Sequence, residues 1–205
     1  MLLKKFTDNC IDMPLNIPNL LTWFRILLIP VFVAVFYLSD STISLHQKHL
    51  LSTAIFWLAA ITDWLDGYLA RALDQGSAFG AFLDPVADKL MVAAALIVLV
   101  KLNLVDVFIA FIIIGREITI SALREWMAQL GNSKSVAVSM LGKFKTAFQM
   151  IAILFLLYQE PILGISTLWW GTLLVYLAAV LTLWSMVYYL MLAMPQILDK
   201  SRNQN

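Results

Sequence analysis

Residues 50–100 read LLSTAIFWLAAITDWLDGYLARALDQGSAFGAFLDPVADKLMVAAALIVLV, and this stretch decides the fold. It begins and ends with apolar runs long enough to be buried in a bilayer, and a regular frame of four aspartates lies between them: Asp63, Asp66, Asp84 and Asp88. A charged side chain in a membrane segment costs roughly 2.5 to 3.5 kcal/mol on insertion scales, so it is expected to serve function. The four aspartates therefore predict a functional site at the membrane surface.

The composition is that of a membrane protein. The chain has 205 residues, of which 61% are hydrophobic and only 13% are charged, whereas soluble domains contain about 25% charged residues. No segment has the composition of a separate soluble domain, so we expect one integral membrane domain over residues 1–205. The net charge of +1 says little about partners, because the distribution of charge matters more than its sum in a membrane protein. We expect no nucleic-acid partner.

Six stretches are candidates for membrane helices, since a span needs about 20 mostly apolar residues. They cover approximately residues 19–38, 50–71, 85–104, 107–127, 144–158 and 166–194. The predicted fold is therefore all-α and integral to the membrane, with a six-helix bundle over residues 19–194. We interpret residues 1–18 as a short interfacial N-terminal segment and residues 195–205 as a cytoplasmic tail.

The basic residues predict the orientation of the chain. With six spans, most of the lysines and arginines outside the spans fall on one side of the membrane, whereas Lys48 and Lys101 fall on the other. Positively charged loops stay in the cytoplasm. Both termini and the turn that joins the aspartate segments are therefore expected on the cytoplasmic side.

The spacing of the aspartates predicts where their side chains point. Asp63 and Asp66 are three residues apart and share one helix face, while Gly80, Asp84 and Asp88 repeat every four residues and share another. Two helices joined by a short loop can bring all four carboxylates together, and divalent cations would relieve their mutual repulsion. Oxygen ligands without a nearby His or Cys favour Mg²⁺ or Mn²⁺ over zinc.

Taken singly, these residues allow other interpretations. Asp84 before Pro85 is also typical of a helix N-terminus. Asp66 followed by Gly67 is also typical of a turn, and Arg71 is a candidate neutralising partner for an aspartate. Together, these interpretations do not explain eight fixed positions in apolar surroundings, so we favour the metal site.

The complete frame, D-x2-D-G-x2-A-R-x8-G-x3-D-x3-D, is present without departure and resembles the signature of the CDP-alcohol phosphotransferases. These integral membrane enzymes join a CDP-activated group to an alcohol and release CMP. The segments ITDWLDGYLARALDQGSAFGAFLDPVADKLMVA, IIIGREI and NIPNLLTWFRILLIP are similar to the bacterial branch of the family that makes phosphatidylglycerophosphate. The resemblance implies six membrane helices, usually in a homodimer, in the bacterial inner membrane, with a cavity open to the cytoplasm.

The resemblance also implies roles for individual residues. Asp63, Asp66 and Asp84 would hold two divalent ions, Mg²⁺ or Mn²⁺, on the CDP pyrophosphate. Asp88 would take the proton from the attacking hydroxyl and would also neighbour a metal ion. The residues implied around the CDP-lipid are Asn19, Thr22, Arg25, Asp66, Gly67, Ala70, Arg71 and Gly80.

A second group of charges is a candidate binding site for the acceptor. Four cations on the cytoplasmic side of the fourth and fifth spans suit a phosphomonoester: Arg116, Arg124, Lys143 and Lys145. Arginine matches phosphate oxygens through its planar fork, and lysine supplies a point charge. The alternative is that these cations contact anionic lipid. That alternative is weakest for Arg116, which lies inside an apolar run beside Glu117.

These observations together favour transfer of a phosphatidyl group from CDP-diacylglycerol to glycerol 3-phosphate. The aspartate frame recognises only the CDP-lipid, so inositol phosphate, serine or another alcohol stays open as the acceptor. A cation transporter is an alternative from a different class. Transporters usually hold their acids near the midplane between repeats, and this sequence has no evident repeat.

Overall fold

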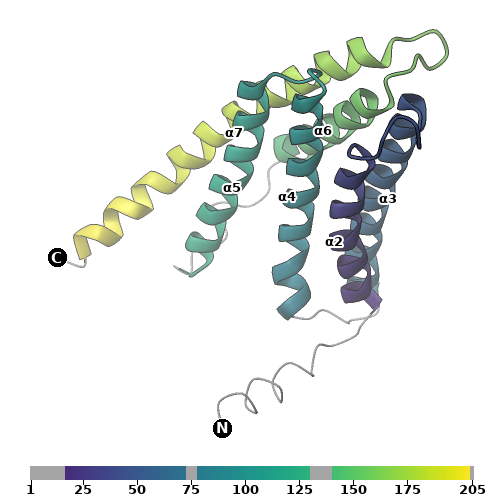
Figure 1. Cartoon of the computed structure of the whole chain (residues 1–205). Helices are drawn as coiled ribbons and strands as arrows, with labels where there is room; N and C mark the ends of the chain where they lie inside the picture. Colours follow the sequence, from purple (N-terminus) through teal and green to yellow (C-terminus); the bar gives the residue numbers. More distant parts are fainter. Residues whose placement is uncertain (1–16, 73–77, 130–139, 204–205) are drawn as a thin grey trace. The chain divides into compact units, whose positions relative to one another are not determined.

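Figure 1 shows the computed structural model of the chain, which describes residues 17–72, 78–129 and 140–203. The helices in these residues are α2 (Ile17–Val35), α3 (Leu45–Ala72), α4 (Ala78–Lys101), α5 (Val107–Gln129), α6 (Met140–Tyr158) and α7 (Thr167–Asn203). The described residues contain no β-strand, only an isolated bridge between Ile162 and Ile165. The all-α prediction is therefore confirmed.

One helix lies over each of the six apolar stretches predicted from the sequence. Within the described ranges, only α7 contains a segment, Thr167–Met191, that is both long and apolar enough to cross a membrane. Asn19–Val35 and Lys145–Tyr158 are shorter apolar helices, and the number of spans stays a prediction. Helix α7 continues to Asn203, so most of the predicted tail is helical. The predicted interfacial segment lies outside the described residues, apart from its last two positions, which begin α2.

The chain divides into two compact units, residues 1–91 and residues 92–205. The first unit contains α2, α3 and the first half of α4, and the second contains the rest of α4 with α5, α6 and α7. In the first unit α2 packs against α3. The rings of Phe32 and Phe56, both fully buried, lie 6.4 Å apart at this contact.

Polar contacts fix the connection between α2 and α3. The ammonium group of Lys48 donates to the carbonyl oxygen of Leu38 at 2.7 Å and also pairs with Asp40. Ser44 begins α3 with a capping box: its backbone N–H donates to Gln47 Oε1 at 2.9 Å, and its Oγ accepts from the Gln47 N–H at 3.3 Å. These contacts satisfy backbone groups that a helix end would otherwise leave unpaired.

In the second unit, α7 packs against both α5 and α6. Ile120, Met127 and Tyr189 are fully buried together at the contact of α5 with α7. Gly171 on α7 lies so close to α6 that an added Cβ would approach the side chain of Leu156 to 2.8 Å. A residue without a side chain is therefore what allows these two helices to approach.

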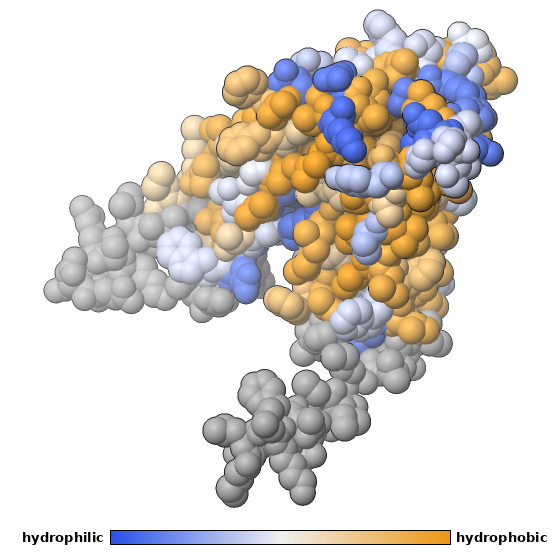
Figure 2. All heavy atoms as spheres, viewed as in Figure 1, coloured by the Kyte–Doolittle hydropathy of each residue, from blue (hydrophilic) through white to orange (hydrophobic). Residues whose placement is uncertain are grey.

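Large apolar side chains stay exposed on the helices of both units, and apolar atoms cover much of the face seen in Figure 2. Examples from five helices are Leu27, Trp57, Ile97, Phe111 and Trp184. Soluble monomers rarely expose apolar patches of more than a few hundred Å². These surfaces are suited to contact with lipid chains.

Candidate functional site

The four aspartates of the frame lie inside helices. Asp63 and Asp66 are in the C-terminal part of α3, and Asp84 and Asp88 are in the first half of α4. Two interpretations that the sequence allowed are therefore wrong. Asp66 and its neighbour Gly67 form no turn, because α3 continues to Ala72, and Asp84 does not begin a helix, because α4 begins at Ala78.

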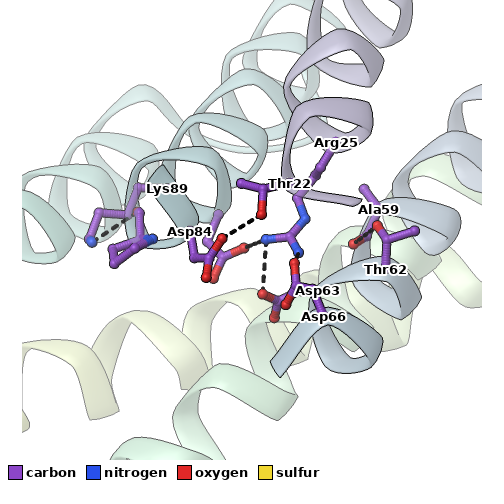
Figure 3. Close-up of polar contacts among 10 residues, drawn as sticks. Thr22, Arg25, Ala59, Thr62, Asp63, Asp66, Asp84 and Lys89 are labelled. Atoms are coloured by element: carbon purple, nitrogen blue, oxygen red, sulfur yellow. Dashed lines mark hydrogen bonds and ion pairs between the residues drawn. The ribbon is translucent and has the colours of Figure 1, made fainter. Parts of the chain in front are cut away.

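The guanidinium group of Arg25, from α2, lies among these carboxylates (Figure 3). Its Nη1 atom pairs with Asp63 Oδ1 at 2.9 Å and with Asp88, and its Nη2 atom pairs with Asp66. Arg25 and Asp66 are 1% and 3% exposed, whereas Asp63 and Asp88 are 45% and 43% exposed. The cluster is therefore buried at Arg25 and Asp66 and accessible to solvent at Asp63 and Asp88.

A polar stripe on α2 faces into the first unit. Asn19, Thr22 and Arg25 are spaced three residues apart, so they share one face of the helix, and all three are buried. Thr22 Oγ1 donates to Asp84 Oδ1 at 2.6 Å. The structure thus brings Thr22 and Arg25, both predicted to line the nucleotide pocket, into direct contact with the aspartate frame.

The other predicted nucleotide residues lie on the same two helices as the aspartates. Gly67 directly follows Asp66 on α3, and Gly80 is buried in the first turn of α4. The side chains of Ala70 and Arg71 lie outside the described part of the structure. Pairing of Arg71 with an aspartate therefore stays a prediction.

The chemistry of the donor set fits hard divalent cations. Three carboxylates pair with the one guanidinium group and the fourth, Asp84, accepts from Thr22, so −4 + 1 leaves a formal charge of −3 if all four are ionised. Carboxylate oxygens are the ligands that Mg²⁺ and Mn²⁺ prefer. Among the described side chains, no group of three acids has the geometry of a formed metal site. Asp63, Asp66 and Asp88 are instead arranged around Arg25.

A second buried polar cluster lies in the second unit. Arg116 on α5 is 6% exposed, and its Nη2 atom donates to Ser185 Oγ on α7 at 3.1 Å. Glu117 pairs with Arg116, 3.5 Å away, and with Lys145 on α6, which is 1% exposed. One carboxylate therefore holds two buried cations from two helices. Such burial is not expected of cations that only contact lipid headgroups, because the headgroups lie at the surface of the membrane.

Arg124 belongs to the same face of α5, two turns after Arg116. Its guanidinium carbon lies 5.4 Å from the ring centroid of Tyr189, within the range of a cation–π contact. The Nε atoms of both Arg116 and Arg124 are buried without a partner in the described structure. The fourth predicted cation, Lys143, lies in α6, but its side chain is outside the described part.

The sequence analysis missed three residues of this second cluster. Ser185 and Tyr189 lie on successive turns of α7, and Gln149 follows Lys145 by one turn of α6. The Oε1 atom of Gln149 is buried and has no partner in the described structure. The available signal was a polar side chain inside an apolar helix, as in TLWSMVYYL and FKTAFQMIA.

Comparison with known proteins gives concordant matches. Residues 15–189 match the sequence model of the CDP-alcohol phosphatidyltransferase family. The chain is 51% identical over 191 residues to a Salmonella typhimurium protein, with coverage of 92% of this chain and 100% of the relative. For an Escherichia coli K12 protein the identity is 50% with the same coverage, and for a Haemophilus influenzae protein it is 48%, with coverage of 91% and 98%. All three relatives are named CDP-diacylglycerol–glycerol-3-phosphate 3-phosphatidyltransferase.

Proposed function

The chain belongs to the CDP-alcohol phosphatidyltransferase family, and on that premise we propose that it transfers the phosphatidyl group from CDP-diacylglycerol to glycerol 3-phosphate. The products are phosphatidylglycerophosphate and CMP. The family resemblance inferred from the aspartate frame is confirmed, and relatives that match almost the whole chain are named for this reaction. The observation that carries the proposal is the convergence of Asp63, Asp66 and Asp88, from two helices, on one buried point.

The aspartate frame would hold the divalent ions. Asp63, Asp66 and Asp84 are the proposed ligands of two ions, Mg²⁺ or Mn²⁺, with Asp88 beside them. Bound there, the ions would neutralise the pyrophosphate and make CMP a better leaving group. The polar face of α2 supports a nucleotide site at the same place, because Thr22 touches Asp84 and Arg25 touches the other three aspartates.

Asp88 is the proposed general base. The acceptor oxygen forms a bond to the phosphorus that carries diacylglycerol, the bond from that phosphorus to the CMP oxygen breaks, and the hydroxyl proton passes to the Asp88 carboxylate. Its 43% exposure supports this role, because a base must reach the hydroxyl of an incoming substrate. Asp66, which is 3% exposed, suits a fixed ligand better.

The cation cluster of the second unit would bind the phosphate of the acceptor. Arg116, Arg124 and Lys145 carry three positive charges against the one carboxylate of Glu117, and two guanidinium Nε donors there have no partner in the part of the chain that the structure describes. A phosphomonoester would supply both the missing charge and the missing acceptors. This balance favours glycerol 3-phosphate over serine, which carries no phosphate. Inositol phosphate is the remaining competitor.

The membrane arrangement is proposed on the same basis. We infer six spans in a bacterial inner membrane, both termini in the cytoplasm, an active site open to that side, and a homodimer. The long apolar segment of α7 and the exposed apolar side chains support burial in a bilayer. In this arrangement the acyl chains of the donor stay in lipid while its headgroup reacts in water.

The test is acceptor-dependent release of CMP. Purified protein in detergent micelles containing CDP-diacylglycerol should release CMP with Mg²⁺ or Mn²⁺ when glycerol 3-phosphate is added, and much less with inositol phosphate or serine. A preference for either of those acceptors would overturn the acceptor assignment. If the protein releases no CMP with any acceptor and instead carries cations across the membrane of proteoliposomes, a transporter would be favoured.

A further inference from the structure

Arg25 occupies an unusual position for a residue expected to contact a nucleotide. It is the largest fully buried side chain of the described structure, at 1% exposure, and it pairs with three carboxylates of the aspartate frame. Its Nε atom has no partner among the described residues, so the polar contacts of the side chain there are those of its two terminal nitrogens. Those nitrogens tie α2 to Asp63 and Asp66 on α3 and to Asp88 on α4.

Arg25 engages oxygens of two of the proposed metal ligands, Asp63 and Asp66, and of Asp88 beside them. The guanidinium group takes Asp63 Oδ1, Asp66 Oδ2 and Asp88 Oδ1. A dication placed among the same oxygens would lie within a few ångströms of the guanidinium group, and like charges at that range repel strongly away from water. The carboxylates are also arranged around the guanidinium rather than in a metal-binding geometry, as far as the described side chains show.

We propose that Arg25 is an internal counter-cation that competes with the divalent metal for the carboxylates of the aspartate frame. Without metal, the guanidinium neutralises the acids that it contacts and keeps the three helix segments together. Metal binding displaces it, and the freed guanidinium becomes available to an anionic ligand. This inference rests on the proposed function, because it takes the aspartates to be metal ligands.

The competition has a thermodynamic consequence. Two cations that exclude each other from one set of oxygens are negatively coupled, and couplings between sites commonly change affinity by about 5- to 150-fold. Removing the charge of Arg25 should therefore tighten metal binding. It should also destabilise the metal-free protein, since the carboxylate of Asp66 would be buried without a counter-charge and the neighbouring carboxylates would repel it.

The experiment is a titration of purified protein with Mn²⁺ in the absence of substrate, following free Mn²⁺ by electron paramagnetic resonance. Arg25→Gln keeps most of the side-chain length and removes the charge, so its Mn²⁺ affinity should be at least about tenfold tighter than that of the original protein. Arg25→Lys keeps the charge but loses the planar fork, and its affinity should lie between the two. Lys89→Gln is the matched control, because it removes one charge next to Asp88 in the sequence, from a side chain that donates to the Pro85 carbonyl, at 3.0 Å, and pairs with no aspartate among the described residues. The Mn²⁺ affinity of Lys89→Gln should differ from that of the original protein by much less than tenfold.

Thermal unfolding gives a second readout. Without metal, Arg25→Gln should have a lower Tm than the original protein. Saturating Mn²⁺ should raise the Tm of Arg25→Gln by more than it raises the Tm of the original protein, because a ligand that binds more tightly stabilises the folded state more. If Arg25→Gln does not fold without metal, Arg25→Lys still tests the proposal, because the proposal requires its Mn²⁺ affinity to exceed that of the original protein.

The failures are distinguishable. Unchanged or weaker Mn²⁺ binding in both Arg25 variants, with clear binding to the original protein, would overturn the competition and leave the metal site standing. The absence of Mn²⁺ binding to the original protein, both with and without CDP-diacylglycerol, would overturn the competition together with the metal part of the proposed function.

Discussion

At the scale of single residues, the aspartates of the frame differ from Asp106 in their partners. Those of the frame contact side chains of another helix, Arg25 or Thr22, whereas Asp106 accepts from a backbone N–H close to it in the sequence. Asp84→Asn should remove nearly all activity, because the change takes away a charge that the proposed divalent ions would need while keeping the size of the side chain. Asp63→Asn and Asp66→Asn should do the same. Asp106→Asn is the control: Asp106 accepts a bond from the Phe108 N–H at 2.7 Å at the start of α5, and asparagine caps helices equally well. CMP release measured over a range of Mg²⁺ concentrations checks this, and strong activity of a frame variant in chelator would contradict it.

The role of Asp88 is open to a sharper test. As a general base it should contribute about 10²- to 10⁴-fold to kcat, so Asp88→Asn should lose that much kcat while the KM for CDP-diacylglycerol stays nearly unchanged. The measurement is the steady-state rate at increasing Mg²⁺. Recovery of most of the rate at high Mg²⁺ would instead identify Asp88 as chiefly a metal ligand.

In the proposed acceptor site Ser185 would be a positioning residue, because it contacts Arg116 and would act through it rather than on the substrate. Its Oγ donates to the Thr182 carbonyl at 2.9 Å and accepts from Arg116 at 3.1 Å. Hydrogen bonds to charged groups contribute about 1.5 to 3 kcal/mol. Ser185→Ala should therefore raise the KM for glycerol 3-phosphate by about tenfold or more, with little change in the KM for CDP-diacylglycerol. Ser185→Thr keeps the hydroxyl and should restore the acceptor KM. Equal rises in both KM values would indicate a structural role.

At the scale of helices, the contact of α6 with α7 depends on Gly171. Its Cβ position lies 2.8 Å from Leu156 Cγ and 3.2 Å from the Leu156 backbone nitrogen, so Gly171→Ala should push the helices apart and destabilise the protein by about 1 to 3 kcal/mol. Gly115→Ala is the matched control, because nothing lies within 4 Å of its added Cβ, and alanine is the better helix former by about 1 kcal/mol. Thermal unfolding in one detergent checks both changes, and equal Tm values for the two variants would contradict the close approach.

The sequence predicted the helices well because the information for them is local. Runs of apolar residues, with polar residues between them, placed each of the six predicted stretches over a helix, although α4 begins at Ala78 rather than at residue 85 and α7 ends at Asn203 rather than at residue 194. The ends were harder to predict. Asp84–Pro85 is typical of a helix start, yet α4 begins at Ala78, so this local pair does not determine where the helix begins. The same holds for Asp66–Gly67, which stays inside α3.

At the scale of the whole molecule, the sequence identified most residues of the two polar clusters but not which of these residues contact one another. The frame and its family resemblance selected Arg25 as a nucleotide residue, but its pairing with three aspartates depends on how α2 packs against two other helix segments. Ser185 could not be selected, since a serine in an apolar helix is equally typical of a hydroxyl bonded to its own backbone. Residue spacing determines which side chains share a face, and packing determines what that face meets.

The orientation of the chain in the membrane is predicted by its basic residues alone, and it can be tested with single cysteines. The connection of α6 with α7 is expected on the non-cytoplasmic side, and Leu163 at its tip is 96% exposed. Leu163 has φ 51°, and Gly164 beside it has φ 81°, so the turn is tight. Leu163→Cys in a Cys10→Ser background should react with a membrane-impermeant maleimide in intact spheroplasts.

The natural Cys10, near the N-terminus, is the control for the opposite side. It should stay unlabelled in intact spheroplasts and react only after the membrane is permeabilised, because the lysine-rich side of the chain is retained in the cytoplasm. Labelling of both cysteines in intact spheroplasts would mean an even number of spans between them and would contradict the six-span arrangement. Labelling of Cys10 alone would invert the orientation and place the aspartate frame outside the compartment in which CDP-activated lipid is expected.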